Sequence, residues 1–320
     1  MVKKLKARER GIALLVVMLG VALMTLIIFD FSTTATLGYL SAANQANELR
    51  AYYLARSGVG VGLGLLAQDS RTDQLTQGTP PYDSLFDVWA APFPPMNVDG
   101  GTAAVAIVDE ARKLNINQLV LGTQNAGLNQ AFALALERLF TILGISPEII
   151  PAIADWIDFD NITSPGGAEM DYYLQLTPPY APRNGYMPTI GDLKMVRGID
   201  DATFNRLLPF LTVVPENQVN VNTAPPEVLA ALSPDLFANQ DLVKAIVTAR
   251  MIRPFSNLTD VGNIPGLGQY MRQFSELLTT RSKYFMINGM GTFAGSRKLV
   301  HPIFLRQPNG TALLVSWQED

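Results

Sequence analysis

The 320-residue chain contains no cysteine and a single histidine, His301. Without cysteine it cannot form a disulfide, use a thiolate nucleophile, or hold zinc or an iron–sulfur cluster through sulfur. A Ser-His-Asp triad could be built only around His301, and a histidine-rich metal site is impossible. The formal net charge of −4 gives no overall positive field that would attract nucleic acid. These absences exclude several common classes of catalytic and binding site.

The remaining composition is that of a folded protein, because hydrophobic residues make up 48% of the chain and charged residues 16%. The length is sufficient for two folded units. Asp109 with Glu110, or the carboxylates of residues 155–171, are the remaining candidates for an acid/base pair. Nothing in the sequence places them opposite a nucleophile or a substrate pocket. The sequence therefore predicts that the protein is not an enzyme.

The N-terminus is basic and is followed by a long apolar run. Residues 12–29, IALLVVMLGVALMTLIIF, carry no charge, and as a helix they would be roughly 27 Å long, enough to cross the hydrocarbon core of a bilayer. The positive-inside rule keeps the basic flank in the cytoplasm and places everything after Asp30 on the other side. The basic flank consists of Lys3, Lys4, Lys6, Arg8 and Arg10, offset by Glu9.

An ordinary secretory signal peptide is the competing interpretation of this N-terminus. A signal peptide ends in a small-x-small cleavage site followed by loop residues, whereas this sequence continues without proline until Pro80. We therefore predict one helix over 12–67, roughly 80 Å long at standard rise. Apolar residues three to four apart in its outer half can pack on a folded domain; these include Leu40, Leu49, Tyr53, Leu54 and Val61.

The rest of the chain reads as strand, helices, then strands. Residues 102–110 form an apolar strand, and an Asn-Gly turn at 309–310 indicates a hairpin between about 303 and 317. Between them the periodicity and the proline positions predict helices near 128–143, 147–158, 192–196, 200–210, 226–232 and 241–251. Strands on both sides of a helical block predict an α+β fold in which that block is inserted into a small domain with an antiparallel sheet.

A charged leader, a glycine and an apolar helix that runs on past the bilayer resemble the precursors of type IV pilins and pseudopilins. The resemblance implies that residues 1–11 are a leader, that prepilin peptidase cuts after Gly11, and that Ile12 becomes a methylated N-terminus. Most members carry glutamate at the fifth mature position, where this chain has Val16. In the family that carboxylate is thought to pair with the amine of the subunit ahead, so its absence indicates a filament tip, or loss in a divergent pilin.

Several segments along the whole chain resemble general secretion pathway protein K, the large minor pseudopilin of type II secretion systems. They include LRAYYLARSGV at 49–59, DEARKLNIN at 109–117, PGGAEMDYY at 165–173 and VNVNTAPPEVLAAL at 219–232. The resemblance implies a pseudopilin core built from 68–112 and 281–320, with a large all-α insertion over 113–280. It also implies a bacterial inner-membrane protein with a periplasmic body, which joins two other minor pseudopilins at the tip of the pseudopilus.

Five carboxylates lie in a Gly-Pro loop: Asp155, Asp158, Asp160, Glu169 and Asp171. They repel one another unless they are solvated, paired or bound to a cation, and calcium prefers six to eight such oxygen ligands. The spacing does not match an EF-hand. A solvated loop, with Asp155 as a helix cap, is the alternative. The resemblance to protein K favours calcium. We expect the neighbouring aromatic residues, Trp156, Tyr172 and Tyr173, to be core anchors.

Two other functions remain open from the sequence. VNVNTAPPEVLAAL with IPGLG at 264–268 is also typical of helix-hairpin-helix modules, which would make the chain a membrane-anchored, competence-type DNA receptor. However, residues 219–276 carry four basic against five acidic side chains, and DNA affinity needs an excess of Lys and Arg. We therefore expect no nucleic acid partner. A minor pilin of a type IV pilus is the second alternative.

Overall fold

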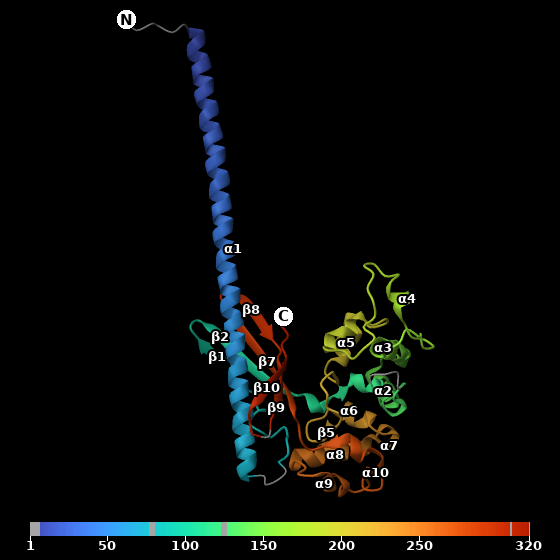
Figure 1. Cartoon of the computed structure of the whole chain (residues 1–320). Helices are drawn as coiled ribbons and strands as arrows, with labels where there is room; N and C mark the ends of the chain where they lie inside the picture. The colour runs from blue at the N-terminus through green and yellow to red at the C-terminus, as the bar shows by residue number, and fades with distance from the viewer. Residues whose placement is uncertain (1–6, 77–80, 123–126, 308, 320) are drawn as a thin grey trace.

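The computed structural model describes residues 7–76, 81–122, 127–307 and 309–319. Most of the predicted leader, residues 1–6, lies outside these ranges. Figure 1 shows one long helix that extends far beyond the rest of the molecule, an antiparallel sheet packed beside its C-terminal half, and a body of short helices beside the sheet. Buried apolar residues form two clusters, one between the long helix and the sheet and one inside the helical body.

The long helix, α1 (Ala7–Thr76), is longer at both ends than the predicted range 12–67. The predicted C-terminal boundary is wrong because the polar segment after Ala67 continues the helix. Asp69 and Asp73 lie four residues apart and are both buried, so their side chains share one face of the helix. Arg71 and Leu75 remain exposed on the other side. The acidic face of this last part is therefore turned toward the protein rather than toward water.

The antiparallel sheet has the strand order β1-β2-β7-β9-β10, with β8 also paired to β7. The central pair is β2 with β7, which runs in register from Gly101 opposite Phe293 to Asp109 opposite Phe285. The predicted strand 102–110 and the hairpin between 303 and 317 are confirmed. The strands are β1 (Met96–Val98), β2 (Gly101–Asp109), β7 (Tyr284–Phe293), β8 (Ser296–Val300), β9 (Ile303–Arg306) and β10 (Ala312–Ser316).

Glycines on β7 allow α1 to lie unusually close to the sheet. A Cβ atom added at Gly291 would collide with the backbone oxygen of Ala51, and one at Gly289 with that of Ala55. On the helix side, a Cβ at Gly58 would come within 2.6 Å of the carbonyl oxygen of Ala104 in β2. The backbones of α1 and β7 therefore touch where larger side chains would hold them apart. The sheet and the C-terminal half of α1 thus form two closely packed layers.

Helices are the main secondary structure of the inserted segment, which was predicted to be all-α. Several of its helices begin at a polar capping side chain: Asn129 accepts a hydrogen bond from Phe132 N, and Asp200 from Thr203 N. The α-helices are α2 (Gln130–Leu143), α3 (Ile150–Ile157), α4 (Met170–Tyr173), α5 (Asp201–Leu207), α6 (Pro226–Ala231), α7 (Pro234–Ala238), α8 (Gln240–Ile252), α9 (Leu258–Gly262) and α10 (Met271–Phe274). The 3-10 helices are η1 (Glu110–Arg112), η2 (Ile116–Leu119), η3 (Pro147–Ile149), η4 (Ile190–Met195) and η5 (Ser275–Leu277).

Two short parallel strand pairs also lie in the inserted segment, which the sequence did not predict. β3 (Leu114–Asn115) pairs with β4 (Leu211–Thr212), and β5 (Val219–Asn220) pairs with β6 (Leu278–Thr279). Each strand has two residues, too few to give a recognisable periodicity. β5 begins the second half of the insertion and β6 lies at the end of that half. Their pairing therefore returns the chain to the sheet, where β7 follows. The short helix predicted at 192–196 is the 3-10 helix η4, which ends at Met195.

Candidate assembly helix and cation-binding loop

Residues 12–29 in the N-terminal half of α1 are apolar on all sides and exposed, without packing on the rest of the described chain. Ile12 is 59% exposed, Val16 64% and Phe29 72%. Among the described residues, α1 is the one helix that is long and apolar enough to cross a membrane. A helix that is apolar around its circumference needs a lipid or protein environment. This part of α1 therefore requires either the bilayer or the helices of other subunits.

Three threonine hydroxyl groups in this half of α1 donate to backbone oxygens of the helix itself. Thr25 Oγ1 donates to Val21 O at 2.8 Å, Thr33 Oγ1 to Phe29 O at 2.9 Å, and Thr36 Oγ1 to Ser32 O at 2.8 Å. Such bonds remove the cost of placing a hydroxyl among apolar groups. Up to Phe29, the helix surface thus offers its neighbours an almost purely apolar contact.

Gly11 and Ile12 lie within the continuous helix, and no atom lies within 4 Å of a Cβ added at Gly11. The fold itself therefore does not require a glycine at this position. Val16 offers only an exposed apolar side chain, so no carboxylate is available there to pair with an amine. These observations leave the predicted roles of Gly11, Ile12 and Val16 as predictions.

Three of the five loop carboxylates lie close together at the C-terminal end of α3. Asp155 in the last turn of α3, Asp158 at its C-cap and Glu169 before α4 each offer an oxygen within 4.8 Å of the other two. Asp155 is fully buried and Glu169 is 3% exposed. A Cβ on Gly167 would collide with the carboxylate of Asp155, so glycine is needed for the loop to pass this close.

This trio lacks a positive partner among the described residues. Both carboxylate oxygens of Glu169 and Oδ1 of Asp158 are buried without a hydrogen bond. Burial, and then the neighbouring carboxylates, raise the pKa of Glu169 to about 8 and that of Asp158 to about 6. Burial also raises the pKa of Asp155, against two hydrogen bonds from Ser164 N. Unpaired buried carboxylates are costly, and a hard cation held by these oxygens would remove that cost.

The other two predicted ligands lie outside the trio. Asp160 is half-buried, and its Oδ1 accepts a hydrogen bond from Ile162 N at 2.7 Å, while Asp171 is exposed on α4. Asp160 still raises the pKa of both Asp158 and Glu169 by charge repulsion. The structure therefore favours Asp155, Asp158 and Glu169 as the inner set, with Asp160 near it.

The aromatic residues beside the loop divide into two groups. Trp156 and Tyr173 are buried core anchors, as predicted, with ring centroids 5.1 Å apart. Tyr172 is 38% exposed and lies under the guanidinium of Arg197, so its prediction as a core anchor is wrong. Arg197 also donates to Gly167 O at 2.8 Å, which fixes the backbone of the acidic loop from its other side.

Asp109 and Glu110 are held by hydrogen bonds and an ion pair within the fold. Asp109 Oδ2 accepts hydrogen bonds from Thr223 Oγ1 and Ser282 Oγ, while Glu110 pairs with Lys113 at 2.6 Å. Burial raises the pKa of Asp109 to about 6 against these hydrogen bonds. This network holds the start of the insertion to the sheet.

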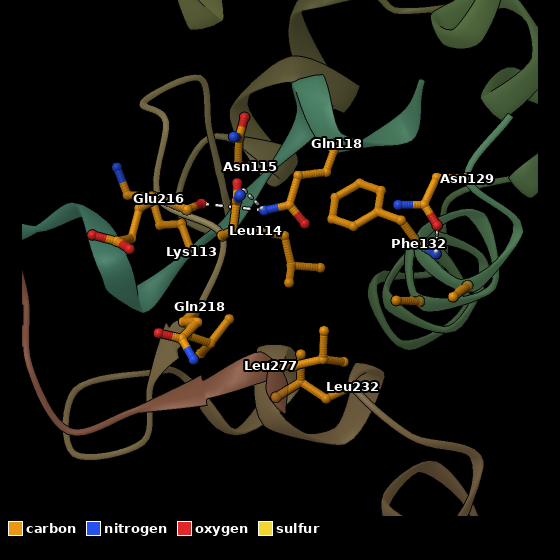
Figure 2. Close-up of a pocket in the computed structure, with 14 residues that line it drawn as sticks. Lys113, Leu114, Asn115, Gln118, Asn129, Phe132, Glu216, Gln218, Leu232 and Leu277 are labelled. Atoms are coloured by element: carbon orange, nitrogen blue, oxygen red, sulfur yellow. Dashed lines mark hydrogen bonds between the residues drawn. The ribbon is translucent and has the colours of Figure 1, made fainter. Parts of the chain in front are cut away.

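The helix-hairpin-helix-like segments do not form a basic surface. Arg250, one of the few cations of this region, is buried in α8 and donates to Val221 O at 2.7 Å. A cavity of about 80 Å³ lies nearby between β3, α2 and α6, with Phe132, Leu232 and Leu277 pointing into it (Figure 2). Gln118 crosses its upper edge with hydrogen bonds to Glu216 O and Asn217 Oδ1. Because this cavity holds little more than a few waters, it is a packing gap rather than a ligand site.

Two family models, both described as type II secretion system protein K, match residues 112–216 and 219–281. Type II secretion system protein K of Pseudomonas aeruginosa is 33% identical over 232 residues, covering 70% of this chain and 68% of that protein. The chain belongs to the type II secretion system protein K family. The same protein of Pectobacterium carotovorum subsp. carotovorum is 29% identical over 298 residues, covering 88% of each chain.

The fold is also that of a solved structure. A chain in the crystal structure of the GspK–GspI–GspJ complex from the enterotoxigenic Escherichia coli type 2 secretion system matches with a TM-score of 0.72 and 19% identity. The match covers 88% of this chain and 99% of that chain. The predicted family and α+β fold are confirmed, and this member of the protein K family is a minor pseudopilin of a type II secretion system. Family membership supports the predicted secretion-system role over the type IV pilus and competence-receptor alternatives.

Proposed function

We propose that this minor pseudopilin caps the tip of the pseudopilus and starts its assembly. The observation that carries the proposal is Val16, which offers no carboxylate to a subunit ahead of it although the surrounding helix is fully exposed for contact. A subunit that follows no other needs no such group, and an unpaired carboxylate among apolar helices would be costly. The role is structural rather than catalytic.

Assembly is driven by burial of the apolar half of α1. Before assembly this half lies in the inner membrane, with the N-terminus in the cytoplasm and the body in the periplasm. On assembly it exchanges lipid for the apolar helices of other minor pseudopilins, where close packing holds the subunits together. The body has two parts, a pseudopilin core of 68–112 with 281–320 and an insertion over 113–280, and its bulk beside α1 leaves no room for a further subunit above it.

Co-purification tests the proposed assembly. The full chain, processed by its own prepilin peptidase, is expressed with the two other minor pseudopilins of its secretion system and solubilised in mild detergent. We expect the three to elute together, and immunogold labelling of the body to mark one end of each pseudopilus. Gold spread along the shaft, or association of the other two while this chain elutes alone, would refute the tip assignment.

We further propose that the acidic loop binds calcium through Asp155, Asp158 and Glu169. Support comes from the buried oxygens of Asp158 and Glu169 that have no hydrogen-bond partner, and from the lack of a Lys or Arg side chain paired with the trio among the described residues. Glu169→Gln should lower calcium affinity at least tenfold, because it removes one of three charged ligands of a hard cation. Asp171→Asn is the matched control, since Asp171 is exposed on α4, directly after the acidic loop. Equal calorimetric affinities for the two variants would contradict the assignment.

A further inference from the structure

A second group of carboxylates lies at the other end of the molecule, where α1 ends against the sheet. Asp69 and Asp73 come from the last turns of α1, and Asp83 comes from the loop that follows. All three are at most 3% exposed, and each offers an oxygen within 4.8 Å of the other two. A fourth carboxylate, Asp87, adds its negative charge beside them. This group lies on the pseudopilin core and shares no residue with the acidic loop.

Arg306 of β9 supplies a single positive charge to this group. Its Nη1 lies 3.0 Å from Asp69 Oδ2 and its Nη2 contacts Asp83 Oδ1, while the guanidinium stacks over the ring of Phe285. These contacts commit the guanidinium to Asp69 and Asp83. Asp83 Oδ2 also accepts a hydrogen bond from Ser282 N at 2.7 Å. One guanidinium therefore faces three buried carboxylates and the charge of Asp87, so the negative charge of the group exceeds its positive charge.

Asp73 is the one carboxylate of the three that Arg306 does not contact. It is 97% buried, since its exposed fraction is 3%, yet within the described ranges no hydrogen bond or ion pair reaches its carboxylate. Asp87, in contrast, accepts hydrogen bonds from Ser84 N at 2.7 Å and Trp89 Nε1 at 3.2 Å. A buried carboxylate without a partner is destabilising unless a proton or a cation neutralises it.

The electrostatics of the group agree with this picture. Burial, followed by repulsion from the other carboxylates, raises the pKa of Asp69 to about 8 and that of Asp73 to about 6, although Arg306 opposes both shifts. Arg281 also lowers the pKa of Asp73, but as the last of its causes. The group thus holds its charge at neutral pH only at a cost. The C-terminal end of α1 adds the negative end of the helix dipole, which favours a cation.

We propose that Asp69, Asp73 and Asp83 form a second divalent-cation site, in which the cation binds beside Arg306 and takes Asp73 as its free ligand. Carboxylate oxygens are the ligands that calcium prefers, and each oxygen bound to Arg306 keeps a second lone pair. Asp83 also contacts the insertion, because its backbone N donates to Thr280 O at 2.8 Å and its backbone O accepts from Asn220 Nδ2 at 3.1 Å. A cation here would clamp α1, the sheet and the insertion together.

The experiment uses the full chain in detergent with the acidic loop disabled by Asp158→Asn and Glu169→Gln. In this background we expect one calcium per chain by equilibrium dialysis, and a rise in Tm of about 5 °C at saturating calcium. Adding Asp73→Asn should abolish both the bound calcium and the rise. Adding Asp99→Asn, an exposed aspartate on the β1–β2 turn, should leave both unchanged. Because the loop is already disabled, failure of its own calcium assignment would not affect this result.

Unfolding in chelator keeps the test valid if Asp73→Asn alters the fold. Since Asp73 has no described partner to lose, Asp73→Asn should leave Tm in chelator unchanged or raised, as charge repulsion is removed. A marked loss of Tm in chelator would show that the carboxylate has a structural partner and would overturn the proposal. The absence of stoichiometric calcium in the loop-disabled background, or its retention after Asp73→Asn, would also overturn it.

Discussion

Thr223 Oγ1 donates a hydrogen bond of 2.5 Å to Asp109 Oδ2, joining residues 114 positions apart in the chain. Asp109 ends the central strand β2, and Thr223 follows β5 in the insertion. Both are buried, so the bond is made to a carboxylate that water does not reach. Thr223→Val keeps the shape of the side chain but removes the donor. We expect a loss of about 1–3 kcal/mol in the free energy of unfolding, measured by urea titration.

Thr259→Val is the matched control for this substitution. Thr259 is exposed on α9, so the same chemical change there should alter the free energy of unfolding by at most about 0.5 kcal/mol. Equal losses for the two variants would show that the bond to Asp109 does not hold the insertion to the sheet.

Hydrophobic periodicity was sufficient to predict the local parts of the fold. The apolar run of α1, the alternating strand before Asp109 and the turn at Asn309-Gly310 each act within a few residues. The end of α1 was predicted wrongly because its last turns are held by Arg306, more than 200 residues later. Contacts at that separation leave no local pattern in one sequence.

The two candidate cation sites also differ in how far the sequence predicts them. The acidic loop was predictable because its carboxylates lie within one short Gly-Pro segment. Asp69, Asp73 and Asp83 were missed because each looks like an ordinary polar residue beside a helix end or in a loop. The one available signal was the spacing of Asp69 and Asp73 by four residues, which places both on the face of α1 that meets the sheet.

Gly11 is predicted to serve the peptidase rather than the fold. Because no atom lies within 4 Å of a Cβ at this position, Gly11→Val should leave folding intact and block cleavage. Immunoblots of membranes should show a full-length precursor that keeps its leader, together with loss of secretion. Gly20→Val is the control, since Gly20 lies on the same exposed helix with equal space. Normal cleavage of Gly11→Val would refute the placement of the processing site.

Val16→Glu tests the proposed place at the tip. A glutamate at the fifth mature position can pair with the N-terminal amine of a subunit ahead, so we expect more of this chain within sheared pseudopilus shafts. The ratio of this chain to the major subunit, measured by quantitative immunoblot, should rise severalfold. Val17→Glu carries the same charge on the neighbouring exposed position and should not raise the ratio. Similar ratios for both variants would show that the residue at position 16 does not support the placement of this chain at the tip.

Gly291→Ala tests the close contact between α1 and β7. A methyl group at this position would collide with the backbone of Ala51, which cannot move without shifting the helix. We expect a loss of about 1–3 kcal/mol in the free energy of unfolding. Gly60→Ala is the control on α1, where a Cβ meets nothing within 4 Å, and it should stabilise the helix by about 0.5–1 kcal/mol. Equal effects of the two substitutions would contradict the proposed backbone contact.

The raised pKa values of the acidic loop predict how calcium binding depends on pH. Without a cation, the folded chain holds protons on Glu169, with a pKa of about 8, and on Asp158, with a pKa of about 6, more tightly than the unfolded chain does. This protonation contributes stability that is fully present below about pH 4 and is lost as the pH rises through 6 to 8.

Calcium must displace these protons, so its affinity should rise between pH 6 and pH 8. Isothermal titration at the two pH values measures the change, and the heat in buffers of different ionisation enthalpy reports the protons released. Glu169→Gln should flatten the pH dependence, because its neutral side chain has no proton to release, whereas Asp171→Asn should leave it as in the parent chain. If the calcium affinity of the parent chain stayed constant from pH 6 to pH 8, calcium would not be displacing a proton from Glu169, and the prediction would be wrong.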